Sequence, residues 1–210
     1  LTASISGLLK SATSIMATMR AHRIELMIKK LLTLPIPDQY QVQTTHITMT
    51  DGTRLPISVI GQGAPVLMLH AYGMDAREFL PFILPLASKY TFYLPHLRGF
   101  GLAQPIGLTQ FDFVRQYADD LHVVIEQICL ARNIDALPVA AISMGAQVMW
   151  SYFERFGAAR VSRYLNIDQS PAIHNQDDWQ GGLFGSRQQE VFDIFRGVID
   201  MSLPYADAQS

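Results

Sequence analysis

The sequence predicts an α/β protein with a mostly parallel sheet that carries helices on both faces. From residue 65 onward, short continuous apolar runs alternate with longer amphipathic stretches, a pattern typical of buried parallel strands joined by helices. The composition agrees, because 49% of the 210 residues are hydrophobic and only 16% are charged, which suits one domain with a substantial core. Before these runs, two extended stretches flank Asp51-Gly52, which predicts an N-terminal β-hairpin.

Residues 1–34 are expected to form an amphipathic helix that ends at a proline-rich break. Leu8, Ala12, Ile15 and Met19 recur at helical spacing, and the first 30 residues hold five basic side chains and one acidic one. We expect the apolar stripe of this helix to cover the domain or a partner subunit. Peripheral contact with an anionic membrane surface is the alternative. No apolar run reaches the ~18–20 residues of a membrane span.

The predicted core spans residues 42–170. Residues 75–88 form a helical piece interrupted by Pro81 and Pro85, and Thr109 and Asp112 are expected to form a capping box at the start of a long helix. A further helix should run from Met144 to about residue 156. Asp119 and Asp120 are interpreted as solvated or helix-bracing charges. The predicted buried strands lie at residues 65–70, 90–97, 136–142 and 163–168.

Ser143 stands at the junction between the third buried strand and the helix after it. The stretch reads Ala141-Ile142-Ser143-Met144-Gly145, which fits the nucleophile-elbow pattern G-x-S-x-G with alanine for the first glycine. Such a turn lifts the serine hydroxyl clear of the sheet, and its flanking residues must be small because strand and helix backbones nearly touch. A buried serine bonded to a neighbouring carbonyl is the structural alternative.

Two further motifs follow the first two parallel strands, at the sheet edge where such proteins bind ligands. The first reads His70-Ala71-Tyr72-Gly73, and the second, "HLRGFGLA", runs from His96 to Ala103. With the elbow, their order and spacing resemble the α/β-hydrolase superfamily, in its cap-bearing serine esterase-like branch. The family forms are H-G-x-G and D-x-R-G-x-G-x-S, so Ala71, His96 and Ala141 are departures.

The resemblance implies a serine hydrolase acting on a carboxylic ester or related acyl substrate through an acyl-enzyme on Ser143. The backbone N–H groups of Tyr72 and Met144 would form the oxyanion hole. His70 and Arg98 would brace the site loops, whereas His96 replaces a carboxylate that usually does so. A serine nucleophile argues against the epoxide hydrolases and haloalkane dehalogenases of this family, which use a carboxylate at that position. Three departures at once leave an alternative open, a non-catalytic binding or interaction protein that kept the fold.

The triad of this fold runs serine, acid, histidine in chain order. Asp168 is a weak candidate for the acid, and His174 is the one histidine after Ser143. Residues 171–210 are expected to begin a helical cap over the site. The family's base lies beyond the cap, so the acid and the base are expected beyond Ser210, and the chain is expected to be truncated.

The remaining expectations concern cofactors, partners and location. No zinc or nucleotide motif occurs, so neither metal nor cofactor is expected. The formal net charge of −2 gives no case for nucleic acid, and a small acyl or ester substrate is the expected partner. Cys129 is the single cysteine, which fits a reducing compartment and a cytoplasmic location. The oligomeric state is open.

Overall fold

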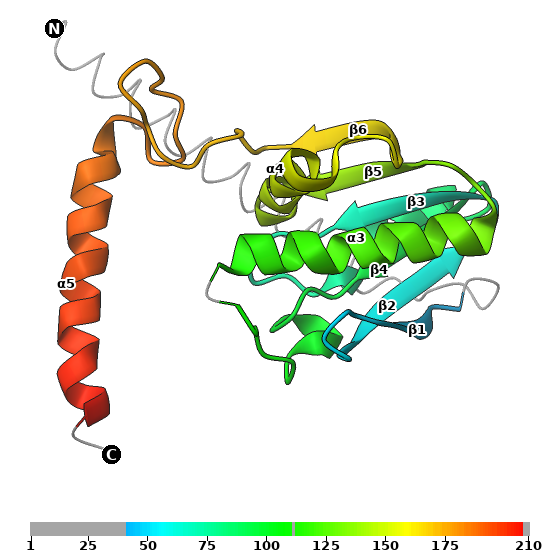
Figure 1. The fold of residues 1–210 in the computed structure, drawn as a ribbon, viewed down its shortest axis with the longest axis horizontal. Helices are drawn as coiled ribbons and strands as arrows, with labels where there is room; N and C mark the ends of the chain where they lie inside the picture. The colour runs from blue at the N-terminus through cyan, green and yellow to red at the C-terminus, as the bar shows by residue number, and fades with distance from the viewer. Residues whose placement is uncertain (1–40, 111, 208–210) are drawn as a thin grey trace, which may run out of the picture.

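The computed structural model describes residues 41–110 and 112–207, which build a six-stranded sheet in the order β1-β2-β4-β3-β5-β6. The strands β3, β4, β5 and β6 are parallel to one another. Strand β2 is antiparallel to both of its neighbours, β1 and β4. A mostly parallel sheet is therefore confirmed (Figure 1). The strand bounds are Gln43–Thr48 (β1), Arg54–Gly61 (β2), Ala64–Leu69 (β3), Tyr90–Pro95 (β4), Leu137–Ile142 (β5) and Val161–Ile167 (β6).

The predicted hairpin joins β1 to β2. Gly52 has a φ of +83° in the turn, a backbone conformation that glycine adopts without steric cost. The backbone N–H of Thr53 donates to the Asp51 carboxylate at 2.9 Å, which closes the turn locally. The hairpin prediction at Asp51-Gly52 is confirmed.

Helices cover both faces of the sheet, as the sequence predicted. The helices α3 (Phe113–Arg132) and α4 (Met144–Phe156) lie on one face (Figure 1). The short helices η1 (Ala76–Phe79), α2 (Leu80–Ile83) and η2 (Leu84–Leu86) form a second apolar cluster with Ile60, Phe92 and Leu94. A parallel sheet needs this double cover, because apolar side chains project from both of its faces.

The start of α3 differs from the expected capping box. Asp112 alone caps the helix, and its carboxylate accepts from the backbone N–H of Arg115 at 3.1 Å. Thr109 lies outside the helix, where its hydroxyl donates to the Gln116 side chain at 2.6 Å. The prediction failed because an Asp that follows a loop can itself be the N-cap. Helix α4 ends where the sequence predicted, and its C-cap is Gly157 at a φ of +72°.

The segment after β6 contains η4 (Gly185–Arg187) and the long helix α5 (Gln188–Asp207). Figure 1 shows α5 standing apart from the sheet, on the side to which the arrows of β3, β5 and β6 point. The sequence predicted helical structure in this region. The predicted N-terminal helix lies outside the described residues. None of the described helices combines the length and apolar character that crossing a membrane requires.

Candidate active site

The turn from β5 into α4 holds Ser143 in a strained conformation. Its φ is +48° and its ψ is −117°, a region that non-glycine residues enter only when the surrounding structure forces them. The backbone N–H of Ser143 donates to the Ile167 carbonyl of β6 at 3.0 Å. The Ser143 hydroxyl makes no capping hydrogen bond to α4, although serine is a favoured N-cap residue. The side chain thus lies at the N-terminus of α4 but does not cap the helix.

The close approach of α4 to β3 explains the small residues around Ser143. A Cβ added at Gly145 would lie 2.7 Å from Leu69 Cβ and 2.9 Å from the His70 carbonyl oxygen. Ala141 is buried on β5, with 1% of its surface exposed, so one methyl group fits where the family pattern has glycine. Packing therefore demands glycine after Ser143 and accepts alanine before it.

The two expected oxyanion donors follow neighbouring strands at the same register. Leu69 of β3 pairs with Ala141 of β5, and each stands three residues before its candidate donor, Tyr72 or Met144. Because β3 and β5 are parallel, both donors lie at the carboxyl edge of the sheet. The start of α4 adds the positive end of the helix dipole at this edge. The Tyr72 side chain is 77% exposed and the Met144 side chain is buried.

His70 is fully buried beneath this edge, and its hydrogen bonds fix its protonation state. Its Nε2 accepts from the backbone N–H of Leu97 at 3.1 Å, so its Nδ1 carries the hydrogen and donates to the Ala71 carbonyl at 2.8 Å. Burial lowers the pKa of His70 below its ordinary value, since desolvation penalises the charged ring. A neutral His70 thus links the loop after β3 to the loop after β4.

Arg98 is also buried and carries a polar network that the sequence indicated only in part. Its guanidinium donates through Nε and Nη2 to both Asp120 oxygens, at 2.7 and 2.8 Å, and lies 2.8 Å from an Asp51 oxygen. The hydrogen bonds that Arg98 donates to these carboxylates raise its pKa, and the bond to Asp120 contributes most. The network ties the loop after β4 to α3 and to the β1–β2 turn.

Of the two interpretations of Asp120, a solvated charge is wrong, and a charge that braces the helix is confirmed by its pair with Arg98. Only 3% of its side chain is exposed, whereas Asp119, which pairs with Arg155, is 25% exposed. The signal was available in the sequence, because Asp120 lies three residues after Tyr117 and one before Leu121, on the inward stripe of α3. The sequence did not reveal its partner, since Arg98 lies 22 residues away.

The candidate acid and base residues of the chain are placed as follows. The register pairs Ile142 with Ile167, so Asp168 and Ser143 each follow the last paired residue of adjacent strands. Asp168 is exposed and has a φ of +56°. His174 is exposed, and its ring packs edge-on against Phe192 of α5 at 5.2 Å. No hydrogen bond links either side chain to Ser143 within the described residues.

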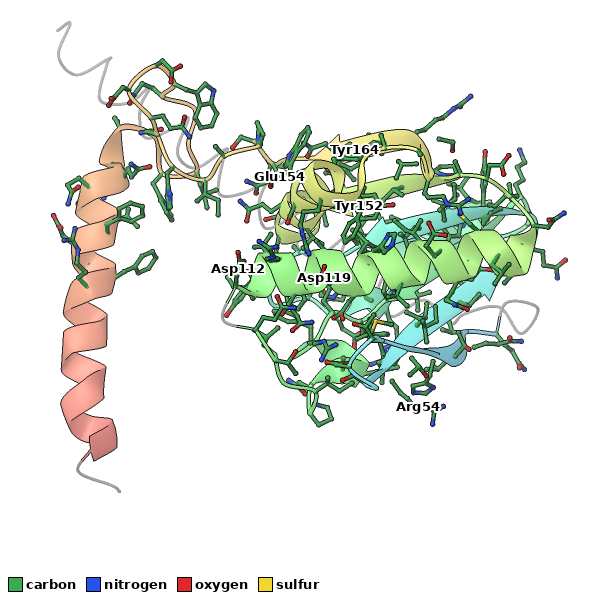
Figure 2. The ribbon with its side chains drawn as sticks, in the orientation of Figure 1. Arg54, Asp112, Asp119, Tyr152, Glu154 and Tyr164 are labelled. Atoms are coloured by element: carbon green, nitrogen blue, oxygen red, sulfur yellow. The ribbon has the colours of Figure 1, made fainter. Side chains whose placement is uncertain are left out.

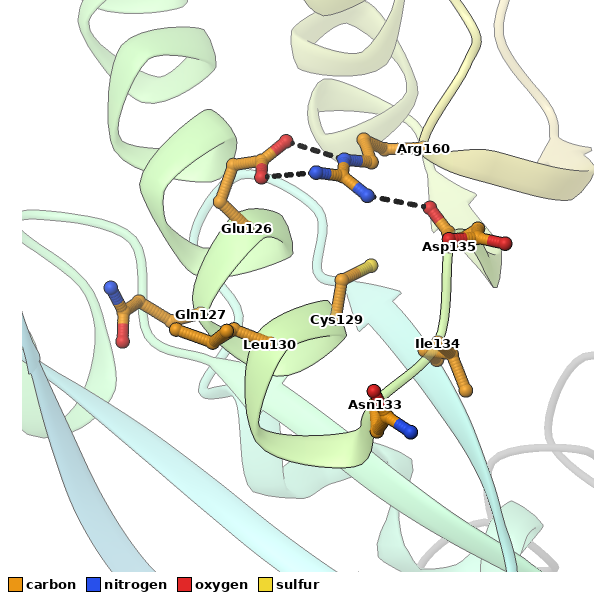
Figure 3. A pocket seen from close by; sticks show the side chains of 8 residues that line it. All are labelled: Glu126, Gln127, Cys129, Leu130, Asn133, Ile134, Asp135 and Arg160. Atoms are coloured by element: carbon orange, nitrogen blue, oxygen red, sulfur yellow. Dashed lines mark hydrogen bonds and ion pairs between the residues drawn. The ribbon is translucent and has the colours of Figure 1, made fainter.

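Two cavities lie away from the elbow. One, of about 430 Å³, is at the opposite end of the sheet, where Arg160 donates to both oxygens of Glu126 at 2.8 and 2.9 Å and to the Asp135 carbonyl (Figure 3). The other, of about 500 Å³, runs along α4 between Val114 and the segment after β6; Figure 2 shows Glu154 of its lining near the start of α3. Neither cavity is lined by Ser143.

The chain matches a family model described as the alpha/beta hydrolase fold over residues 64–200. The esterase EaEST from Exiguobacterium antarcticum is similar in structure, with a TM-score of 0.59 and 24% identity. That likeness covers 67% of this chain and 51% of the esterase. Because the identity is low, this comparison concerns the fold alone.

Two curated relatives are each similar to this chain over part of its length. A pimeloyl-[acyl-carrier protein] methyl ester esterase from Legionella pneumophila (strain Corby) is 31% identical over 124 residues, which are 58% of this chain and 44% of the relative. A soluble epoxide hydrolase from Corynebacterium sp. (strain C12) is 27% identical over 135 residues, which are 64% of this chain and 45% of the relative. The chain thus spans about half the length of the curated relatives it matches.

Proposed function

The chain belongs to the α/β-hydrolase fold family, and we propose that it is a serine hydrolase that cleaves a carboxylic ester or a related acyl substrate. One observation carries the proposal: Ser143 sits at a strained φ of +48° between β5 and α4, with a hydroxyl that does not cap the helix. A serine with a purely structural role would gain more from an unstrained backbone and a capping hydrogen bond.

In the proposed reaction, Ser143 Oγ attacks the carbonyl carbon of the ester. The negative oxygen of the tetrahedral intermediate accepts hydrogen bonds from the backbone N–H groups of Tyr72 and Met144. The C–O bond to the alcohol then breaks, the alcohol leaves with a proton, and an acyl ester remains on Ser143. Water attacks this ester, which releases the carboxylic acid and restores the hydroxyl.

The two curated relatives act on different bonds, and the elbow residue discriminates between them. By the family resemblance, an epoxide hydrolase needs a carboxylate where this chain has Ser143. An ester substrate, as named for the Legionella relative, therefore fits this chain better than an epoxide.

The proposal requires a general base that withdraws the Ser143 proton. Among the described histidines, the rings of His70 and His96 are held by buried hydrogen bonds, and His122 stacks on Phe156 with ring centres 4.1 Å apart. His174 packs on α5, and His46 lies on the edge strand β1, with β2, β4 and β3 between it and β5. We therefore assign the base to none of these five residues. The segment 171–207 is proposed to begin a cap, since α5 stands on the Ser143 side of the sheet (Figure 1).

The decisive experiment is labelling of the full-length protein with a fluorophosphonate probe, together with hydrolysis of short p-nitrophenyl esters. Wild-type protein should be labelled at Ser143 and should turn over, and Ser143→Ala should lose labelling while kcat falls by about 10⁴- to 10⁶-fold. Ser151→Ala, on the same helix, is the matched control and should keep both activities. Turnover of Ser143→Ala within tenfold of wild type would refute the assignment.

A non-catalytic binding protein with this fold is the second candidate. It is favoured because no histidine among the described residues is assigned as the base for Ser143. Absence of labelling and turnover in a folded full-length protein would support it. Labelling at Ser143 would exclude it, because only an activated serine reacts with the probe.

A further inference from the structure

His96 occupies the position of a family carboxylate, and it is completely buried at the end of β4. Both ring nitrogens have partners. The backbone N–H of Leu102 donates to Nδ1 at 3.2 Å, and Nε2 lies 2.9 Å from the Ser58 hydroxyl. Because Nδ1 accepts, the ring hydrogen of a neutral His96 must be on Nε2, where it donates to Ser58. The imidazole thus supplies an acceptor to the loop without a buried charge.

His96 and His70 hold the two ends of one loop. His70 Nε2 accepts from the N–H of Leu97, and His96 Nδ1 accepts from the N–H of Leu102. Between these ends, the Phe100 ring packs edge-on against His70 at 5.4 Å and against Tyr72 at 5.3 Å. The loop 97–102 therefore reaches the proposed oxyanion residue Tyr72 through Phe100.

Gly101 leaves no space for a side chain between the loop and the His96 ring. A Cβ added at Gly101 would collide with His96 Nδ1 and would lie 3.0 Å from Asp75 Cγ. Gly101 also has a φ of +49°. The loop backbone therefore approaches His96 at a position where only glycine fits.

If His96 gains a proton on Nδ1, the nearby carboxylate of Asp75 can accept a hydrogen bond from it. Asp75 Oδ1 lies 3.6 Å from Nδ1. Asp75 also accepts from Arg77, at 2.9 Å from Nε, and His70 is the other titratable group nearby. Burial lowers the pKa of His96 to about 4, Asp75 opposes this, and Arg77 and His70 add to it. His96 is accordingly neutral at pH 7.

We propose that His96 is a positioning residue for the loop 97–102 and, through that loop, for the oxyanion residue Tyr72. As a neutral ring it fixes Leu102 and, through Phe100, fixes Tyr72. When Nδ1 gains a proton, it can no longer accept from Leu102 and is attracted to Asp75, so the loop 97–102 is released. The structural part stands on the hydrogen bonds above, whereas its effect on catalysis rests on the proposed function.

The first test is a nitrogen-detected NMR titration of the full-length protein with labelled histidine. His96 should show the Nε2–H tautomer at pH 7, and the Leu102 amide should shift and lose protection from hydrogen exchange as His96 titrates near pH 4. A His96 that titrates near 6.5, or a Leu102 amide that ignores the titration, would overturn the proposal. The readout needs no enzyme activity, and it avoids the acid limb that a catalytic base would itself impose on kcat.

The second test separates the two nitrogens by substitution. In His96→Asn the amide oxygen can replace Nδ1 as the acceptor for Leu102, whereas in His96→Gln the longer amide reaches the position of Nε2, near Ser58. We expect the Asn variant to retain most of the wild-type kcat and the kcat of the Gln variant to fall about tenfold. The KM of each variant should stay within twofold of wild type, because oxyanion contacts act in the transition state. Thermal melts check that both variants fold.

Three outcomes are distinct. Equal kcat values in the two folded variants would refute the positioning role of Nδ1. A wild-type protein without turnover would refute the proposed function, and the NMR titration would still decide the loop clamp. Ser58→Ala, which removes only the partner of Nε2, should lose less than threefold in kcat, and a tenfold loss would assign the effect to the wrong nitrogen.

Discussion

Two regions near the carboxyl edge of the sheet differ in how they are held. The loops after β3 and β4, residues 70–75 and 96–103, are fixed by the buried side chains His70, His96 and Arg98, whose polar atoms have partners within 3.2 Å. The segment 171–207 instead exposes large apolar side chains. Leu183, Ile194 and Phe195 are each more than half exposed.

The difference separates two tasks. Buried polar groups in low dielectric stabilise one arrangement strongly and penalise every arrangement that leaves them unpaired. The loops after β3 and β4 can thus hold oxyanion donors to the precision that catalysis demands. Exposed apolar side chains have no such single arrangement, which suits the cap that we propose for this segment. Each prediction below perturbs one region and compares it with the other.

The largest difference should come from two arginines. Arg98→Met removes the bidentate partner of Asp120 and leaves that carboxylate buried without compensation, so we expect a loss of about 3–5 kcal/mol in the free energy of unfolding. Arg196→Met breaks an exposed pair with Asp193 on α5 and should cost at most about 0.5 kcal/mol. Urea unfolding of both variants measures the contrast. Equal losses in the free energy of unfolding would show that the buried ion pair contributes no more to stability than the exposed one.

Two glycine substitutions should change the free energy of unfolding less than Arg98→Met does, and in opposite directions. Gly145→Ala forces a Cβ against backbone and side-chain atoms of Leu69 at 2.7–2.8 Å, and overpacking of this kind costs about 1–3 kcal/mol. Gly197 of α5 has no atom within 4 Å of an added Cβ, so Gly197→Ala should gain up to about 1 kcal/mol from helix propensity. Thermal melts read both signs. A stabilised Gly145→Ala would contradict the close approach of α4 to β3.

How far the sequence predicted these regions depended on the range of the interactions. The hairpin, the strands and the span of α4 follow from local periodicity and turn residues, and all are confirmed. The elbow at Ser143 was recognisable because its signal is five consecutive residues. Ser143 also has the positive φ that such a turn requires.

The partners within the site were not predictable in the same way. The hydrogen bond of His96 to Ser58 spans 38 residues, and Asp120 meets Arg98 only after α3 folds over the sheet. Hydrophobic periodicity places an element, but it does not say which buried polar groups face one another. The missing family carboxylate at residue 96 therefore read as a lost brace, whereas the structure places an imidazole acceptor there.

Acid should weaken the loops after β3 and β4 before it affects the segment 171–207. The pKa of His96 is about 4 in the folded protein against an ordinary 6.5, so between these pH values the unfolded chain binds a proton that the folded chain does not. Stability therefore falls as the pH drops from 6.5 to 4, by about 2 kcal/mol at pH 5 relative to pH 7.5. Urea unfolding at both pH values measures the loss. Because burial lowers the pKa of His70 too, His96→Asn should remove only the His96 share of about 2 kcal/mol from this loss, and an unchanged loss in that variant would assign it to another group.

The smallest expected effect is that of His174→Ala. His174 is exposed in the segment 171–207, packs against Phe192, and has no hydrogen bond to Ser143 within the described residues. Its removal should leave the labelling rate of Ser143 within twofold of wild type in the full-length protein. The matched control is Asn175→Ala, which loses side-chain bonds to Gly182 and Gly185 and should increase proteolysis of this segment without changing the labelling of Ser143. A labelling rate that collapses in His174→Ala but not in Asn175→Ala would identify His174 as the base. The segment after β6 would then supply catalysis itself, and the division of tasks between the two regions would be wrong.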